Sequence, residues 1–255
     1  MIASGTYGTP NWVELVTPDV EAAIAFYGPL LGWSITRGGT AEGTYATATV
    51  GDLDVAGMLE HVPTQGVPPT WTVFLHVEDV DETAEVVRAA GGAVLRPVAD
   101  LPAARVGVVT DPTGGTFGIG GGRGPAGTYL DQGAGTVSWI ELLTRDPRTA
   151  EPFYATVFGW RADTDPQGEV AYTVFSLDDE PVAGMMMMPD EVPAEVPAYW
   201  FVYFAVYDLE AAVARTLELG GGVIAPPMGA GEGRFVVLED AQGAVFGLLE
   251  FPVTE

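Results

Sequence analysis

Residues Asn11 to Trp33 read NWVELVTPDVEAAIAFYGPLLGW, and residues Ser138 to Trp160 repeat the pattern as SWIELLTRDPRTAEPFYATVFGW. The two stretches align without a gap, so that Trp12 meets Trp139 and Trp33 meets Trp160. The residues that they share include, in the first copy, Trp12, Glu14, Leu15, Thr17, Asp19, Phe26, Tyr27, Gly32 and Trp33. This many matches in one register indicate an internal duplication of the chain.

The duplication extends beyond these stretches. Ala56-Gly57-Met58 recurs as Ala183-Gly184-Met185 in the same register, and after a short insertion Trp71 recurs as Trp200. The repeated unit takes up nearly half of the chain, which is the length of a domain, because solenoid repeats span about 20 to 50 residues. The sequence therefore predicts two domains, residues 1–120 and 136–255, joined by a glycine-rich linker at 121–135.

The composition is that of a globular protein, with 47% hydrophobic and 18% charged residues among 255. No apolar run approaches the roughly 18 residues of a membrane span. The first ten residues lack the basic and apolar regions of a secretion signal, so we expect a cytoplasmic protein. The absence of cysteine excludes disulfides, thiolate metal ligands and a cysteine nucleophile.

The net charge is −25. A charge of this sign repels phosphate backbones and anionic membranes, and it concentrates cationic ligands near the protein. We therefore expect a small-molecule partner, and neither nucleic acid nor membrane. The alternative is that the acidity serves solubility alone.

Local patterns predict a strand at Trp12 to Thr17, where apolar and polar residues alternate, followed by a helix that Asp19 caps and Gly32 ends. Three short strands follow, with turns at Gly38-Gly39 and Gly51-Asp52. The same order of elements begins again at Trp71. Each domain is therefore predicted to contain two βαβββ units, which makes the fold class α+β.

This order, together with the D-x-x-x-A-x-x-F-Y helix motif and the L-G-W that follows it, resembles the vicinal oxygen chelate superfamily. That superfamily includes glyoxalase I, the bleomycin-resistance proteins and the extradiol dioxygenases. The resemblance implies that paired βαβββ units form a curved sheet, or cup. It also implies metal ligands on the cup face of the first strand of each unit and of the last strand.

The positions at which the superfamily carries these metal ligands hold other residue types in this chain. They fall on Trp12, Thr72 and Gly118 in the first domain, and on Trp139, Phe201 and Gly247 in the second. None of these side chains is a suitable ligand for a divalent ion. The sequence therefore predicts that the metal site is lost and that no cofactor is bound.

Aromatic and acidic residues in these regions are the candidate ligand-binding groups. Indole rings stand where the superfamily has imidazole, and Glu14 and Glu141 follow two residues later on the same strand face. Gly118 and Gly247 are interpreted as positions that leave room for a ligand, and Met185 and Met187 as an adaptable apolar wall. The full set is Trp12, Glu14, Phe74, His76, Gly118, Trp139, Glu141, Met185, Met187, Phe201, Tyr203 and Gly247. The alternative is that the aromatic and methionine side chains fill the core.

Two main functions remain open at this point, beside an interaction or structural protein with vestigial cups. The first is metal-independent binding of a bulky aromatic, cationic small molecule, in antibiotic resistance or in sequestering a natural product during its biosynthesis. The second is a glyoxalase-like lyase, isomerase or oxygenase-type enzyme acting on a small or polyketide-like substrate, with Glu14, Glu141 and His76 as candidate acids and bases. We expect a monomer, with a homodimer as the alternative.

Overall fold

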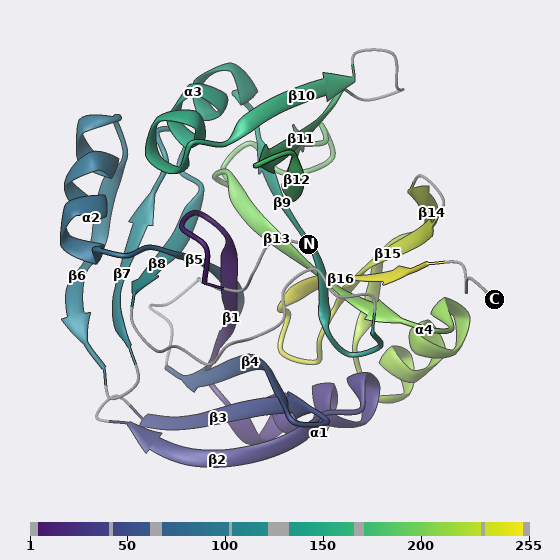
Figure 1. The fold of residues 1–255 in the computed structure, drawn as a ribbon. Coiled ribbons are helices and arrows are strands. Elements are labelled where there is room, and N and C mark those ends of the chain that lie inside the picture. The colour runs from purple at the N-terminus through teal and green to yellow at the C-terminus, as the bar shows by residue number, and fades with distance from the viewer. Residues whose placement is uncertain are drawn as a thin grey trace. The chain divides into compact units, whose positions relative to one another are not determined.

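The computed structural model describes residues 5–40, 43–61, 68–101, 104–121, 133–165, 171–230 and 233–251. In this part of the chain the elements follow one another as four βαβββ modules, which confirms the predicted α+β class. Figure 1 labels each helix and strand. Most of the predicted linker, residues 122–132, and the proline-rich residues 62–67 lie outside the described residues.

The first domain supplies two of these modules. Module 1 consists of β1 (Pro10–Thr17), α1 (Val20–Leu31), β2 (Ser34–Thr40), β3 (Gly43–Val50) and β4 (Leu53–Glu60). Module 2 consists of β5 (Thr70–His76), α2 (Val80–Ala89), β6 (Ala93–Asp100), β7 (Arg105–Thr110) and β8 (Thr116–Gly121).

The second domain supplies the other two. Module 3 consists of β9 (Val137–Thr144), α3 (Pro147–Phe158), β10 (Arg161–Asp165), β11 (Tyr172–Leu177) and β12 (Glu180–Met187). Module 4 consists of β13 (Tyr199–Val206), α4 (Leu209–Glu218), β14 (Gly222–Ala230), β15 (Gly233–Glu239) and β16 (Val245–Glu250).

The caps of the helices follow from the sequence. The Asp19 carboxylate accepts a hydrogen bond from the Ala22 amide at the start of α1, and Gly32 ends that helix in the left-handed conformation, with φ 69°.

The predicted turn at Gly38-Gly39 is wrong, because both glycines belong to β2 and pair with residues of β3. None of the helices in the described part of the chain combines the length and the apolar character needed to cross a membrane.

The chain packs into two compact units. One, the middle unit, comprises Met1–Asn11, Val73–Ala126 and Ile140–Phe201, and so contains most of modules 2 and 3. The other, the end unit, comprises Trp12–Thr72, Gly127–Trp139 and Val202–Glu255, and so contains most of modules 1 and 4. The units do not follow the boundaries of the predicted domains at 120 and 136, which remain a sequence-based prediction.

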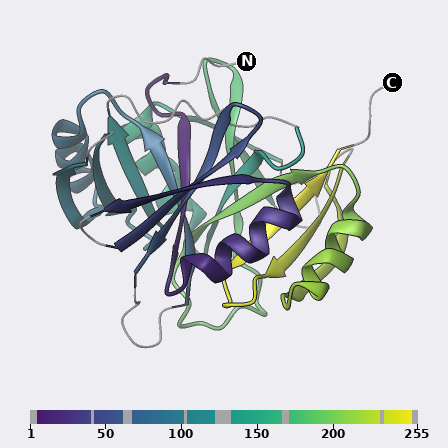
Figure 2. The same ribbon diagram turned by 90° about the horizontal axis from the view of Figure 1, so that it is seen from below.

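Within each unit, every module contributes four neighbouring strands to the sheet. In the end unit β1 pairs in parallel with β4, which continues antiparallel to β3 and β2, while β13 pairs in the same way with β16, β15 and β14. The middle unit repeats this scheme with β5, β8, β7 and β6, and with β9, β12, β11 and β10. Helix α1 packs against α4, and α2 against α3. Figure 2 shows α1 beside α4 in the end unit.

A buried hydrogen-bonded chain joins the two modules of the end unit. The Trp71 indole N–H donates to the Tyr27 hydroxyl (3.1 Å), which in turn donates to Oδ2 of Asp240 (3.0 Å). Tyr27 is fully buried, and its ring packs edge-on against Phe246 of module 4. Burial and the Asp240 charge raise the pKa of the Tyr27 hydroxyl well above its ordinary value, so it remains a donor.

The middle unit contains the same chain at the repeated positions. Trp200 donates to the Tyr154 hydroxyl (3.0 Å), and this hydroxyl donates to Oδ2 of Asp111 (2.7 Å). Tyr154 and Asp111 come from different halves of the sequence. The duplicated Tyr and Asp residues therefore link module 1 to module 4 and module 2 to module 3.

Candidate ligand-binding site

The two faces of β1 have different surroundings. Val13 and Leu15 are fully buried on one face, whereas Trp12 and Glu14 lie on the other. Trp12 is 8% exposed, and Glu14 is partly exposed. The predicted pairing of a tryptophan with a carboxylate on one strand face is therefore present in the end unit.

Tyr45 of β3 joins these two side chains into one hydrogen-bonded group. The Trp12 indole N–H donates to the Tyr45 hydroxyl (3.2 Å), and this hydroxyl is hydrogen-bonded to the Glu14 carboxylate. Burial, followed by the Glu14 charge, raises the pKa of Tyr45 far above its ordinary value. The phenol therefore stays protonated and donates to Glu14. We call this group the Trp12–Tyr45–Glu14 cluster.

Gly57 of β4 makes room for the cluster. It pairs with Glu14 across the sheet, and a Cβ at this position would clash with the Tyr45 hydroxyl oxygen and lie 2.9 Å from Nε1 of Trp12. Neither Tyr45 nor Gly57 is among the site residues predicted from the sequence. The repeat could have identified both residues, because Tyr172 and Gly184 are their identical counterparts in the second copy.

The middle unit contains the second glutamate, Glu141 of β9, which is only 5% exposed. Tyr199 of β13 is close enough to this carboxylate and to Arg145 for both charges to act on its hydroxyl. Burial and the Glu141 charge raise the pKa of Tyr199, and the Arg145 charge opposes them. The Arg145 guanidinium donates to the carbonyls of Val192, Pro193 and Val196, and so holds the proline-rich segment after β12. Glu141 therefore lies near a phenol, as Glu14 does, but Glu141 is buried and Glu14 is partly exposed.

Gly118 was predicted to leave empty space in the cup, and the structure shows that a ring fills this space. Phe74 of β5 pairs with Gly118 of β8, and a Cβ on the glycine would clash with Cδ1 of Phe74. The glycine thus accommodates the ring of its neighbour. His76 follows two residues later on β5 and is partly exposed, and burial lowers the pKa of its imidazole while the Glu78 charge opposes the shift.

Strand register separates the predicted methionines from Glu141. Glu141 pairs with Gly184, and Leu142 pairs with Met185. Because side chains alternate along a strand, Met185 and Met187 lie on the face of the fully buried Leu142, and Met186 lies on the face of Glu141. Met185 is 1% exposed, and Met187 is 46% exposed at the end of β12.

The remaining predicted residues lie in strands at the repeated positions. Trp139 is partly exposed on β9, and Phe201 and Tyr203 are buried on β13. In the end unit Tyr203 pairs with Gly247, and its ring is 5.8 Å from that of Phe235 in an edge-on arrangement. This unit therefore has an aromatic residue opposite a glycine, as the middle unit does at Phe74 and Gly118.

The residues at the superfamily's metal-ligand positions do not fit a divalent ion. The Trp12 nitrogen carries a hydrogen and donates it to Tyr45, so it offers no lone pair. Gly118 has no side chain, and the Phe74 ring covers it. These positions hold aromatic residues, a threonine and glycines instead.

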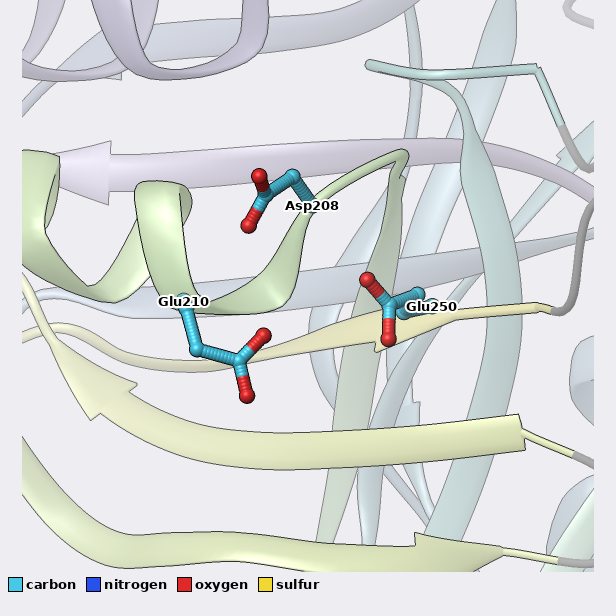
Figure 3. A group of neighbouring side chains, drawn as sticks. All are labelled: Asp208, Glu210 and Glu250. Carbon is cyan, nitrogen blue, oxygen red and sulfur yellow. The ribbon is translucent and has the colours of Figure 1, made fainter.

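One group of carboxylates in the described part of the chain has the spacing of a metal site, and it lies at the start of α4. Figure 3 shows its members, Asp208, Glu210 and Glu250. Asp208 caps α4 through the Ala211 amide, Glu250 accepts from the Leu209 amide, and Glu210 pairs with Arg234. These bonds give each carboxylate a role in capping the start of α4 or in holding β15 and β16 beside it.

The comparisons with known proteins agree with this architecture. The model of the Glyoxalase/Bleomycin resistance protein/Dioxygenase superfamily matches residues 9–119, and that of the Glyoxalase-like domain matches residues 139–249. "Putative glyoxylase CFP32" of Mycobacterium tuberculosis (strain CDC 1551 / Oshkosh) is 40% identical, over 95% of each chain. The chain belongs to the glyoxalase/bleomycin resistance protein/dioxygenase superfamily. "Anthracycline biosynthesis protein DnrV" of Streptomyces peucetius is 34% identical, over 95% of this chain and 93% of its own.

Solved structures of this superfamily share the fold. The Mn(II)-bound glyoxalase from Novosphingobium aromaticivorans superposes with a TM-score of 0.67 at 16% identity, over 96% of this chain and 82% of that one. The 2,3-dioxygenase LapB from Pseudomonas sp. KL28 gives 0.68 at 14% identity, over 97% and 94%. The predicted tandem arrangement of two glyoxalase-type domains is confirmed.

Proposed function

We propose that this protein binds a bulky aromatic small molecule with a cationic substituent, without a metal ion, at the Trp12–Tyr45–Glu14 cluster. The observation that carries the proposal is the hydrogen bond from the partly buried Tyr45 hydroxyl to Glu14, because it orients a partly exposed carboxylate beside two aromatic rings. A ring face and a carboxylate together suit a flat aromatic cation. The net charge of −25 favours the approach of such a ligand.

The name of one relative supports the ligand class. DnrV is named for anthracycline biosynthesis. An anthracycline such as daunorubicin joins a flat, fused aromatic system to an amino sugar that is protonated at neutral pH. We therefore place the function in the binding or sequestration of a natural product of this kind during its biosynthesis or in resistance to it.

The test compares daunorubicin with its neutral aglycone by titration followed through tryptophan fluorescence. Glu14→Gln is expected to weaken daunorubicin binding roughly 3- to 10-fold, the effect of a partly exposed charge pair, and to flatten its salt dependence. Binding of the aglycone should not change. Trp12→Ala should weaken both ligands by about 1–3 kcal/mol, because it removes an aromatic anchor together with a partner of Tyr45.

Asp52→Asn is the matched control. Asp52 is exposed in the turn between β3 and β4, so its substitution makes the same change in net charge in the same module. Equal losses in Asp52→Asn and Glu14→Gln would show that total charge, and not the cluster, attracts the ligand. If Glu14→Gln and Trp12→Ala both bind daunorubicin like the wild type, the cluster is not the site.

The similarity to CFP32, with 40% identity, favours an enzyme as the second candidate. Glu14, Glu141 and His76 would then act as acid or base on an enolisable carbonyl compound. Incubation with methylglyoxal and a thiol, followed by the absorbance of a thioester product, tests this activity. Turnover that Glu14→Gln abolishes and Asp52→Asn preserves would favour the enzyme over the binding protein.

A further inference from the structure

Two turns that precede the first strand of each domain have the same backbone structure. In the middle unit the Thr9 hydroxyl donates to the carbonyl of Thr6, and the Gly8 amide donates to that of His76. In the end unit the Thr136 hydroxyl donates to the carbonyl of Gly133, and the Gly135 amide donates to that of Ala205. These bonds place Tyr7 and Ala134 at equivalent positions.

Each turn also accepts a hydrogen bond from a tryptophan that lies between a helix and the strand that follows it. The Trp160 indole donates to the Gly8 carbonyl (2.8 Å), and the Trp33 indole donates to the Gly135 carbonyl (2.7 Å). Helices α3 and α1 end alike, with Gly159 at φ 71° and Gly32 at φ 69°. The surroundings of the two positions therefore differ mainly in side chains.

Tyr7 covers the end of α3 in the middle unit. Its hydroxyl donates to the carbonyl of Val157 (2.9 Å), and its ring lies 6.1 Å from that of Phe158. The Val157 carbonyl is one of the last four of α3, which have no amide partner within the helix. Tyr7 thus supplies an aromatic surface and one hydrogen-bond donor to a helix C-terminus.

Ala134 supplies neither group in the end unit, and a groove is found at this place. It has a volume of about 410 Å³ and is lined by residues that include Leu30, Leu31, Ala134, Tyr207 and Arg215. Leu30 is the counterpart of Val157 in the first copy of the repeat, so its carbonyl takes the place of the one that accepts from Tyr7. Tyr207 is 72% exposed and stands where the middle unit has Glu78, which gives this groove an additional aromatic side chain.

We infer that the groove between the end of α1, the turn at Ala134 and the start of α4 is a second ligand site, which binds the phenolic ring of a small molecule. Figure 2 shows the two helices that flank it. The ring takes the place that Tyr7 fills in the middle unit, and its hydroxyl donates to the Leu30 carbonyl. A volume of about 410 Å³ lies within the roughly 300–1,000 Å³ of small-molecule sites. This site uses no residue of the Trp12–Tyr45–Glu14 cluster.

The probe is p-cresol, which has the ring and hydroxyl of a tyrosine side chain. A titration followed by the methyl NMR signal of Ala134 is expected to show a saturable shift, and toluene, which lacks the hydroxyl, should bind at least several-fold more weakly. Ala134→Tyr fills the groove from within and should reduce p-cresol affinity at least 10-fold. Tyr207→Ala, at an exposed position, should weaken binding without affecting folding.

The middle unit provides the reciprocal variant. Tyr7→Ala should open the equivalent groove and raise the number of bound p-cresol molecules from one to two. No saturable shift of the Ala134 signal in the wild type, or unchanged binding in Ala134→Tyr and Tyr207→Ala, would overturn the inference. Glu14→Gln should leave p-cresol binding intact, which separates this site from the proposed function.

Discussion

Removal of the Tyr27 hydroxyl tests the buried chain that holds the end unit together. Tyr27→Phe keeps the ring and its packing, but it leaves two buried polar groups without their partner. These are the Trp71 indole N–H, now 3.1 Å from the hydroxyl, and Oδ2 of Asp240, now 3.0 Å from it. Asp240 is 3% exposed, so water cannot readily replace the lost donor.

The expected cost is roughly 2–4 kcal/mol in the free energy of unfolding. A hydrogen bond to a charged group contributes about 1.5–3 kcal/mol, and an unsatisfied buried donor costs about 1–3 kcal/mol. The lower part of the combined range applies because Oδ1 of Asp240 still accepts hydrogen bonds from the amides of Gln242 (2.8 Å) and Ala244 (2.9 Å). For a chain of this size the loss corresponds to a fall in Tm of roughly 5–15 °C.

The pH dependence of this loss has a definite sign. Burial raises the pKa of Asp240, and the bond from Tyr27 lowers it, so the hydroxyl stabilises the ionised carboxylate. Tyr27→Phe therefore raises this pKa further. The difference in stability between wild type and variant should be largest near neutral pH and should narrow as pH falls through the Asp240 titration, because the protonated carboxyl has no charge to stabilise.

Urea denaturation and thermal melting measure the effect, with two comparisons. Tyr154→Phe breaks the equivalent chain in the middle unit and should cost a similar amount. Tyr207→Phe removes an exposed hydroxyl and should change stability by less than about 0.5 kcal/mol. A loss of less than about 1 kcal/mol in Tyr27→Phe would refute the assignment of the chain as a stabilising contact between modules 1 and 4.

Two further predictions concern the middle unit. Folding lowers the pKa of His76, so the unfolded state binds the imidazole proton more tightly than the folded state does. The free energy of unfolding should therefore rise with pH between the folded pKa and about 6.5. His76→Gln should flatten that rise when stability is measured by denaturation at several pH values. Gly118→Ala should lower the free energy of unfolding by about 1–3 kcal/mol, because the new Cβ would meet the Phe74 ring. Adding Phe74→Leu to this variant should recover part of the lost stability. Equal stability of wild type and Gly118→Ala would contradict the observed packing.

Several features of the fold could be predicted from the sequence because they depend on local patterns. Asp19 and Gly32 mark the ends of α1 through their own hydrogen-bonding and backbone properties. The repeat also identified Trp12 and Glu14 as residues of one strand face. The turn predicted at Gly38-Gly39 failed because glycine permits a turn but does not require one, and pairing with β3 decided the conformation.

The sequence by itself determined the duplication and the four βαβββ modules, since both can be seen in residue types and spacings. The loss of the superfamily's metal ligands stays a prediction from the resemblance. Only the tertiary structure decided that module 1 packs with module 4 and module 2 with module 3, because the four modules share one order of elements and local patterns do not specify which modules pack together. Contacts between distant residues make that choice, as Tyr27 does with Asp240. The hydrogen bond from Tyr45 to Glu14 likewise joins side chains on different strands. Tyr7 fills a space that Ala134 leaves open at the equivalent position. Both features exist only once the chain has folded.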